Sequence, residues 1–405
     1  MPYEVPYDVT AVRAAFPALA EGAAHFDGPG GSQSPAAVAD AVAGVLRSAV
    51  ANRGAVTRAE RRADDLVLAA RQAGADLVGG DPRGVVFGRS MTQLTYDLAR
   101  TLAKNWGPGD EVVVTRLDHD ANIRPWVQAA TAVGAAVHWA GFDRETGVLS
   151  VDDVTSAMSP RTRLVAVTAA SNLLGTRPPV AEIAAAARSV GALTYVDGVH
   201  LTPHDLVSVR DLGADFYVCS PYKFLGPHLG LLYADPELLA QLHPDKLLPA
   251  TDAVPERFEL GTLPYELLAG TTAAVDFLAG LVPATGSRRD RLAASLTALA
   301  RHEAALLSRL DQGLAGIPGV TRHGDPTRDR TPTVLFSVAG VAPDEVHRRL
   351  AERNVNAPAG SFYAVECARW LGLGDAGAVR AGIAPYTDAS DVGRLLTGVA
   401  DLATR

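Results

Sequence analysis

Between residues 84 and 220, short apolar segments alternate with longer segments of helical character. The apolar segments lie at 85–87, 111–115, 136–139, 164–168, 193–196 and 216–219, and the helical segments at 92–105, 122–134, 151–158 and 179–190. Parallel strands need crossover connections, which are usually helices, so this alternation predicts right-handed βαβ units with helices on both faces of the sheet. With a further strand at 229–233, we predict an α/β fold built on a mostly parallel, seven-stranded sheet.

The remaining segments predict a large unit and a smaller unit. Residues 1–25 suggest an N-terminal arm with one short helix, residues 26–275 the large unit, residues 276–315 linker helices, and residues 316–405 a smaller α+β unit that packs with the arm. The predicted elements of the smaller unit are strands at 333–338 and 379–383 and helices at 343–353 and 390–402.

Composition narrows the class of protein. The 405 residues carry a net charge of −8, which gives no support for a surface that binds nucleic acid or an anionic membrane. Two cysteines are too few for a disulfide framework or a cysteine metal cluster, and we expect no metal site and a reducing, cytoplasmic location. No apolar run reaches the roughly 18 residues of a membrane span, and the N-terminus lacks the features of a signal peptide.

Lys223 is the only formal charge between Asp215 and Asp235, in a run of apolar, small and aromatic residues. Burial disfavours the ammonium form of lysine, so the pKa falls and the side chain becomes a nucleophilic amine, as a Schiff-base lysine requires. The simpler alternative is a lysine whose stem covers apolar surface while its ammonium group stays in water.

Asp197 ends the apolar run 192–197 and therefore lies at the carboxyl end of a predicted strand. Open α/β sheets bind ligands at that edge. A carboxylate and a lysine on neighbouring strand ends are the groups that hold pyridoxal 5′-phosphate, because the acid pairs with the pyridine nitrogen and the lysine holds the aldehyde. Taken alone, Asp197 fits a helix cap or a structural ion pair equally well.

Two other segments are candidates for approach to a ligand. Residues 26–35 are rich in glycine and proline but lack the spacing of a nucleotide-binding loop, so a backbone that approaches a small ligand and a plain surface turn both fit. Arg53 lies between two predicted helices and could point into a site.

Four runs of residues resemble, in chain order, motifs of class V aminotransferase-fold enzymes, which are pyridoxal-phosphate enzymes of fold type I. The runs are 118–126 (DHDANIRPW), 171–176 (SNLLGT), 197–200 (DGVH) and 220–223 (SPYK). The chain is most similar to the cysteine desulfurase and selenocysteine lyase branch, in particular its desulfurase-like subfamily. The resemblance extends over nearly the whole chain and implies a pyridoxal 5′-phosphate cofactor and a small amino-acid substrate.

The resemblance also implies roles for individual residues. Lys223 would hold the cofactor aldehyde and move the Cα proton, Asp197 would keep the pyridine nitrogen protonated, and His119 would stack on the pyridine face. Asn172 would bind the phenolic oxygen of the cofactor or the substrate carboxylate. His200 stands where the family often has glutamine and would also bind that phenolic oxygen; a histidine there can titrate near neutral pH.

The implied phosphate site lies at a helix N-terminus formed by Ser90, Met91 and Thr92, where Met91 departs from the Gly-Thr-Thr pattern of the family. Ser220 and Tyr222 would add contacts to the phosphate. Gly261 and Thr262 resemble the loop that reaches the phosphate of a neighbouring subunit, which implies a homodimer with shared active sites.

Arg380 matches the arginine that clamps a substrate α-carboxylate, a task that suits a bidentate guanidinium. Without the family resemblance, an ordinary surface arginine would fit as well. Asn122, Asn172 and Arg53 complete the predicted set of substrate-binding residues.

One departure from the family bears on the reaction. The loop that carries the mobile cysteine of cysteine desulfurases should align with residues 360–363, which read Gly-Ser-Phe-Tyr. Cys367 lies on a predicted helix at 364–371 and Cys219 on an apolar strand, so both are expected to be buried. Because β-elimination needs no cysteine nucleophile, we predict a lyase that cleaves the C–S bond of cysteine or a cysteine S-conjugate. Transamination and a non-catalytic scaffold are the alternatives, and the natural substrate is not encoded in these patterns.

Overall fold

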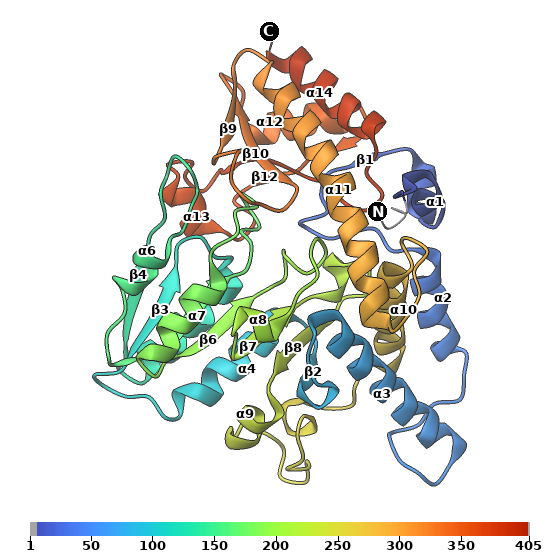
Figure 1. Cartoon of the computed structure of the whole chain (residues 1–405), viewed down its shortest axis with the longest axis vertical. Helices are drawn as coiled ribbons and strands as arrows, with labels where there is room; N and C mark the ends of the chain where they lie inside the picture. The colour runs from blue at the N-terminus through green and yellow to red at the C-terminus, as the bar shows by residue number, and fades with distance from the viewer. Residues whose placement is uncertain (1–5, 404–405) are drawn as a thin grey trace.

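The computed structural model describes residues 6–403 and contains a seven-stranded sheet at the centre of its larger part (Figure 1). The strand order is β2-β8-β7-β6-β5-β3-β4, and all neighbouring strands are parallel except β8, which runs antiparallel to both β2 and β7. The strands are β2 (Val85–Gly88), β3 (Glu111–Thr115), β4 (Ala136–Ala140), β5 (Thr162–Thr168), β6 (Leu193–Asp197), β7 (Phe216–Cys219) and β8 (Gly230–Ala234). The predicted α/β fold with its mostly parallel, seven-stranded sheet is confirmed.

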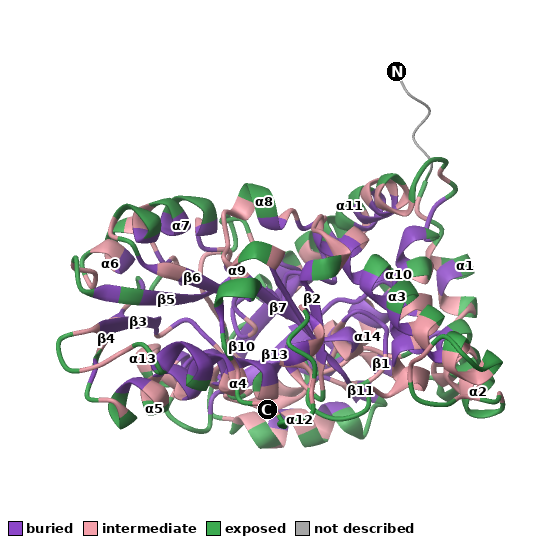
Figure 2. Ribbon diagram, turned by 90° about the horizontal axis from the view of Figure 1, so that it is seen from below, coloured by how far each residue is buried: buried purple, intermediate pink, exposed green. Residues whose placement is uncertain are grey.

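Helices cover both faces of this sheet, as the parallel connections require. Figure 2 shows α4 (Met91–Ala103) and α5 (Arg124–Ala132) on one side and α6 (Val151–Thr155), α7 (Val180–Ser189) and α8 (Val209–Leu212) on the other. The strands between them are largely buried; all five residues of β3, for example, are buried. Their Val-rich composition suits strands that are covered on both faces.

A second group of helices lies beside β2 and β8 and leads to the smaller part. It comprises α2 (Ala36–Leu46), α3 (Arg58–Val78) and α10 (Tyr265–Ala279), which pack together. The long helix α11 (Arg288–Ala315) starts with a capping box of Ser287 and Asp290 and extends to the smaller part (Figure 1). The predicted linker helices at 276–315 thus correspond to the end of α10 and to α11. A short helix, α9 (Pro236–Gln241), follows β8.

The smaller part contains a four-stranded antiparallel sheet of order β12-β13-β10-β9. Its elements are β9 (Val320–His323), β10 (Thr333–Val338), α12 (Pro343–Ala351), β12 (Ala359–Gly360), α13 (Val365–Trp370), β13 (Ala378–Gly382) and α14 (Ala389–Ala403). The predicted strands and helices of this part are present, and the short strands β9 and β12 were not predicted.

The N-terminal arm joins this smaller part directly. After α1 (Val9–Ala14), β1 (Ala24–His25) pairs in parallel with β11 (Val355–Asn356), which brings residues more than 300 positions apart into one ladder. The first five residues of the predicted arm and the last two of the predicted small unit lie outside the described residues, and the predicted unit boundaries stay a prediction. Short 3₁₀ turns are η1 (Pro17–Glu21), η2 (Pro82–Gly84), η3 (Asp120–Asn122), η4 (Pro221–Lys223) and η5 (Glu256–Phe258).

Candidate active site

A cavity of about 780 Å³ lies at the carboxyl edge of the parallel strands. The segments that follow β3, β5, β6 and β7 contribute residues to its wall, as does the N-terminus of α4. The smaller part closes the opposite side with Arg380 of β13 and with Phe362 and Tyr363, which lie between β12 and α13. The cavity therefore lies where an open α/β sheet is expected to bind a ligand.

Lys223 lies in η4 and its amine faces the cavity. The Nζ atom donates a hydrogen bond to the carbonyl oxygen of Pro29 and lies 5.1 Å from the centroid of the Tyr222 ring. Burial lowers the pKa of Lys223 to about 7; the positive charge of Arg380 acts in the same direction, and the negative charge of Asp197 opposes it. Near neutral pH, a large fraction of this amine is therefore unprotonated and nucleophilic.

Asp197 ends β6, next to the strand that leads to Lys223, and lines the same cavity. Its Oδ1 accepts a hydrogen bond of 2.9 Å from the backbone N–H of Val199. Burial raises the pKa of Asp197 to about 6, while the N–H bond from Val199 and the charge of Lys223 favour the carboxylate. A bound cation, such as a protonated pyridine nitrogen, would stabilise the ionised form further.

His119 caps η3, where its Nδ1 accepts a hydrogen bond of 3.0 Å from the backbone N–H of Ala121. The proton of the neutral ring is therefore on Nε2. Burial lowers the pKa of His119 to about 4, with Lys223 and Arg380 adding to the effect, so the ring is neutral at physiological pH. It stacks on Tyr363 with ring centroids 5.6 Å apart and an angle of 28° between the rings. His119 is thus both a cap and a ring in the cavity wall.

His200 also lines the cavity, but its expected titration near neutral pH is wrong. Its Nε2 lies 2.9 Å from the Thr331 hydroxyl and 3.1 Å from the Thr333 hydroxyl, both of which belong to the smaller part. Burial lowers the pKa of His200 well below its ordinary value, and the neighbouring His204 and Arg380 add to the effect. The ring is therefore a neutral hydrogen-bonding group in this pocket.

Arg380 is the most informative charge in the cavity. Its side chain is about 2% exposed, its Nη1 donates to the backbone oxygen of Asn172 at 2.9 Å, and its guanidinium carbon lies 3.8 Å from the centroid of the Phe362 ring. Its Nε has no partner, and no carboxylate among the described residues forms an ion pair with it; Asp27 acts on it only at longer range. Burial lowers the pKa of Arg380 to about 9. An unpaired, buried guanidinium is a binding group for an anion.

Asn172 lies beside this guanidinium and faces the cavity. Its Nδ2 donates to the backbone oxygen of Phe362 at 3.0 Å, and its Oδ1 is buried without a hydrogen-bond partner. Buried polar atoms are almost always paired, so this oxygen points to a ligand that supplies a donor.

The predicted phosphate residues are only partly brought together within one chain. Met91 and Thr92 line the cavity at the N-terminus of α4, and the Ser90 hydroxyl caps that helix by accepting from the N–H of Gln93 at 3.1 Å. β8 passes close to this turn because position 230 is glycine: a Cβ there would lie 2.3 Å from the carbonyl carbon of Ser90.

The other predicted phosphate contacts are placed differently. Tyr222 lines the cavity, whereas Ser220 is buried outside its wall. Gly261 and Thr262 are exposed and do not line the cavity of their own chain. Their predicted contact with a neighbouring subunit stays a prediction.

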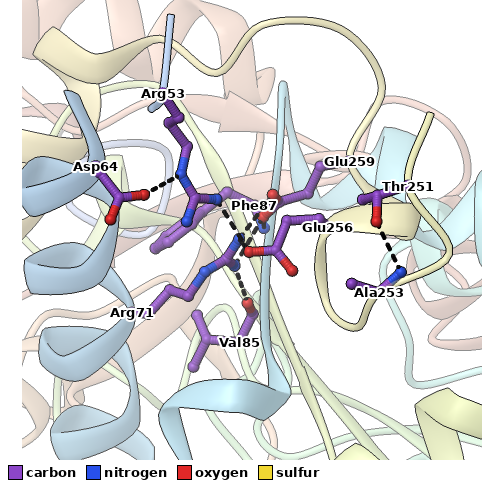
Figure 3. Close-up of polar contacts among 9 residues, drawn as sticks. All are labelled: Arg53, Asp64, Arg71, Val85, Phe87, Thr251, Ala253, Glu256 and Glu259. Atoms are coloured by element: carbon purple, nitrogen blue, oxygen red, sulfur yellow. Dashed lines mark hydrogen bonds and ion pairs between the residues drawn. The ribbon is translucent and has the colours of Figure 1, made fainter. Parts of the chain in front are cut away.

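Two predicted substrate-binding residues do not face the cavity, and these predictions are corrected here. Arg53 forms ion pairs with Asp64 at 2.7 Å and Glu256 at 2.9 Å, in a network at α3 that also contains Arg71 (Figure 3). The amide of Asn122 is buried between Asp118, to which it donates at 2.6 Å, and the indole N–H of Trp126, from which it accepts at 3.0 Å. Both side chains are fully engaged in holding the fold.

Several residues of the cavity wall were not predicted, among them Tyr96 of α4, Asp120 of η3, Arg124 and Gln128 of α5, and Phe362 and Tyr363. Pro29 and Gly30 belong to the loop 26–35 and also line the cavity. Helical spacing could have identified Tyr96, because it lies one turn after Thr92 on the same helix face. The N-terminal loop fits the approach of a backbone to a ligand better than a plain surface turn.

Both cysteines are buried, as expected, and neither lines the cavity. Burial raises the pKa of Cys219 to about 12 and that of Cys367 well above its ordinary value. In this environment both thiols stay protonated and poorly nucleophilic.

These features fit pyridoxal 5′-phosphate in particular. The amine of Lys223 would hold the aldehyde, the carboxylate of Asp197 the pyridine nitrogen, the imidazole of His119 the ring face, and the N-terminus of α4 the phosphate. The unpaired Oδ1 of Asn172 leaves an acceptor for the cofactor or its substrate. Among residues 6–403, no group of three or more histidine, cysteine, aspartate or glutamate side chains could hold a metal ion, and no helix is long and apolar enough to span a membrane.

The fold and this cavity define a pyridoxal-phosphate protein of fold type I. The sequence model of the aminotransferase class-V family matches residues 24–395, and the chain belongs to this family, whose members depend on pyridoxal phosphate. It is 36% identical over 399 residues to the uncharacterized protein MT3887 of Mycobacterium tuberculosis, covering 98% of this chain and 99% of that protein. It is 34% identical over 403 residues to a probable cysteine desulfurase of Pseudomonas aeruginosa, covering 94% and 95%.

A solved structure supports the same assignment. The apo structure of cysteine desulfurase from Thermococcus onnurineus NA1 superimposes with a TM-score of 0.88 at 26% identity, covering 99% of this chain and 98% of that one. The protein is therefore a cysteine desulfurase-like member of the class V aminotransferase family.

Proposed function

We propose that this protein is a pyridoxal-phosphate-dependent lyase that cleaves the C–S bond of cysteine or a cysteine S-conjugate by β-elimination. The observation that carries the proposal is the pairing, in one cavity, of a lysine amine with a pKa of about 7 and a buried guanidinium, Arg380, that no carboxylate of the described residues neutralises. The first group suits an aldehyde cofactor and the second suits the α-carboxylate of an amino acid.

Arg380, Asp197 and Lys223 would each have a different role in this reaction. The cofactor, when bound, supplies an electron sink for the charge that develops at Cα. Arg380 would orient the substrate through its carboxylate, and Asp197 would keep the pyridine nitrogen protonated. Lys223, as a base with a pKa near 7, is suited to accept the Cα proton at neutral pH.

Elimination is favoured over desulfuration because no thiol of the described residues reaches the cavity. Cys219 and Cys367 are buried in the fold, and the segment that should carry a mobile cysteine presents Phe362 and Tyr363 instead. β-Elimination needs only a base at Cα and a leaving group at Cβ, and Lys223 satisfies the first requirement.

We also propose that a second copy of the chain completes the phosphate site through Gly261 and Thr262, which are exposed and do not line the cavity of their own chain. Sedimentation of the loaded protein should show a dimer. Thr262→Val should make the cofactor dissociate faster, while Lys223 should still be labelled by the aldehyde. A loaded monomer would contradict this part of the proposal.

The cofactor is tested by labelling, because the chain has only three lysines: Lys104, Lys223 and Lys246. Pyridoxal phosphate is added, the adduct is reduced with borohydride, and peptides are analysed by mass spectrometry. We expect the label on Lys223, its loss in Lys223→Gln, and its retention in the control Lys104→Gln. An unlabelled Lys223 would favour the non-catalytic scaffold.

The reaction is tested by incubating the loaded protein with cysteine S-conjugates. Equal amounts of pyruvate, ammonia and free thiol would establish β-elimination. A reaction that stops after one turnover and resumes on addition of a 2-oxo acid would establish the alternative, transamination.

A further inference from the structure

Three aromatic side chains belong to the part of the cavity wall that is left after the cofactor residues. Tyr96 lies on α4, and Phe362 and Tyr363 lie in the smaller part; Gln128 of α5 also lines this part of the wall. The whole cavity, at about 780 Å³, lies in the upper part of the range of roughly 300–1,000 Å³ in which proteins bury drug-sized ligands.

The two rings are held in an unusual backbone conformation. Phe362 and Tyr363 have φ angles of 52° and 59°, in the left-handed region that bulky side chains rarely adopt. Two hydrogen bonds hold them there: the Asn172 amide donates to the Phe362 oxygen at 3.0 Å, and the Asp120 N–H donates to the Tyr363 oxygen at 2.7 Å. The fold thus fixes both rings over the cavity.

Tyr363 remains about 74% exposed although it stacks on His119. Because Tyr363 lines the cavity and packs on the ring of His119, its exposed ring is available to a ligand there. A ligand between Tyr363 and the Tyr96–Gln128 wall would cover this ring.

The charges of the cavity limit what that ligand carries. Arg124 lines the wall but is neutralised by Asp120, at 2.8 Å, and by Glu366, which also pairs with Arg116 at 3.1 Å. This group of two arginines and two carboxylates has no net charge. Apart from Lys223, Arg380 is the only cation among the described cavity residues that lacks an ion-pair partner. Besides the N-terminus of α4, where the cofactor phosphate is expected, the cavity therefore offers one anion site, Arg380, which suits the α-carboxylate of the substrate.

We propose that the substrate is an α-amino acid with a bulky, uncharged, preferably aromatic side chain, received between Phe362 and Tyr363 on one side and Tyr96 and Gln128 on the other. This inference rests on the proposed function and names its substrate class: S-aryl or S-aralkyl cysteine conjugates are substrates of choice, and cysteine and acidic amino acids are poor ones.

The test uses the loaded protein and amino acids without a leaving group, so that binding is measured apart from turnover. Dissociation constants are obtained from the change in cofactor absorbance with L-homophenylalanine, L-2-aminobutyrate and L-glutamate. We expect L-homophenylalanine to bind at least about tenfold more tightly than either of the other two. Equal binding of all three, or tighter binding of L-2-aminobutyrate or L-glutamate, would overturn the proposal.

Variants assign the preference to the named residues. Tyr363→Ala should bring the ratio of L-homophenylalanine to L-2-aminobutyrate binding towards one, whereas Tyr363→Phe, which keeps the ring, should preserve it. Glu366→Gln should improve L-glutamate binding, because it leaves Arg124 and Arg116 with one carboxylate fewer. An unchanged ratio in a folded Tyr363→Ala protein would contradict the inference.

The labelling of Lys223 distinguishes a failure of the proposed function from a failure of the proposed substrate class. If Lys223 takes up no cofactor, the proposed function fails and the inference fails with it. If Lys223 is labelled but the three ligands do not differ, only the substrate class is wrong.

Discussion

Two buried arginines in this protein have opposite surroundings. Arg71 is about 3% exposed and Arg380 about 2%. Arg71 forms two parallel bonds of 2.9 Å to the carboxylate of Glu259 and a further contact of 3.3 Å to Glu256 (Figure 3). Arg380 is bound by a backbone oxygen and the face of Phe362, without a carboxylate. Burial alone therefore does not distinguish a structural arginine from a ligand-binding one. The absence of a carboxylate partner marks Arg380 as the ligand-binding one.

The network of Arg71 holds together parts of the chain that are far apart in sequence. Glu259 also accepts from the N–H of Phe87 in β2 at 2.9 Å, and burial raises its pKa in spite of Arg71. The segment around η5 is thereby fixed to α3 and β2. In the cavity, in contrast, Lys223 and Arg380 have no ion-pair partner among the described residues.

The largest expected effect is on the paired arginine. Glu259→Gln leaves the charge of Arg71 buried with Glu256, at 3.3 Å, as its remaining carboxylate, and we expect the free energy of unfolding to fall by about 3–5 kcal/mol. Denaturant unfolding followed by circular dichroism measures the change. Asp375→Asn, which breaks the exposed pair with Arg369, is the control and should have no measurable effect. If both variants changed the free energy of unfolding by the same amount, the buried pair of Arg71 and Glu259 would have no special role in stability.

The unpaired arginine should behave in the opposite way. Arg380→Met removes a charge that has no partner, so stability should be unchanged or higher, while the affinity for amino acids should fall by about 100-fold, or about 3 kcal/mol. Calorimetry with a non-reacting amino acid and the same unfolding experiment test both parts. Loss of stability with unchanged binding would show that Arg380 belongs to the scaffold.

The pH dependence of cofactor loading examines the second unpaired cation, Lys223. Only the neutral amine attacks an aldehyde, and burial lowers the pKa of this lysine to about 7 from 10.5. The loading rate should therefore rise about tenfold per pH unit below pH 7 and level off above it. Stopped-flow absorbance measures the rate. A rate that still rises tenfold per unit between pH 8 and 9 would indicate an ordinary, solvated lysine.

The smallest effect is expected for Arg53, which sequence patterns suggested as a substrate ligand. Its side chain is about 27% exposed and pairs with Asp64 and Glu256. Arg53→Ala should lower the free energy of unfolding by about 1 kcal/mol and leave the dissociation constants of amino acids unchanged. A weaker amino-acid affinity in this variant would restore the original prediction.

The sheet was predictable because each of its strands is a short apolar run that ends at a turn. Asp197 was predictable because it directly follows such a run, and Lys223 because it is a lone charge in an apolar segment. These signals are local in the sequence. Strands of a parallel sheet are buried on both faces, so they appear as short, nearly continuous apolar runs that are easy to identify.

The remaining features depend on partners that are distant in sequence. The partner of Arg53, Glu256, lies 203 positions away, and the β1–β11 ladder has only two residue pairs, too few for a periodic pattern. The neutral state of His200 depends on burial and on its neighbours in space, which sequence patterns do not reveal. Phe362 resembled an ordinary loop residue because its contact, Arg380, belongs to a strand beyond α13.

The ladder of β1 and β11 has a consequence for how the protein is made. Ala24 and His25 have no strand partners until residues 355 and 356 have been synthesised, and the loop that follows β1 carries the Pro29 oxygen that binds Lys223. On the ribosome, the large sheet can form long before this N-terminal segment is anchored. The pocket is thus among the last parts of the molecule to form. In a nascent chain that stalls before residue 355, the loop that carries Pro29 would not yet be anchored over the amine of Lys223.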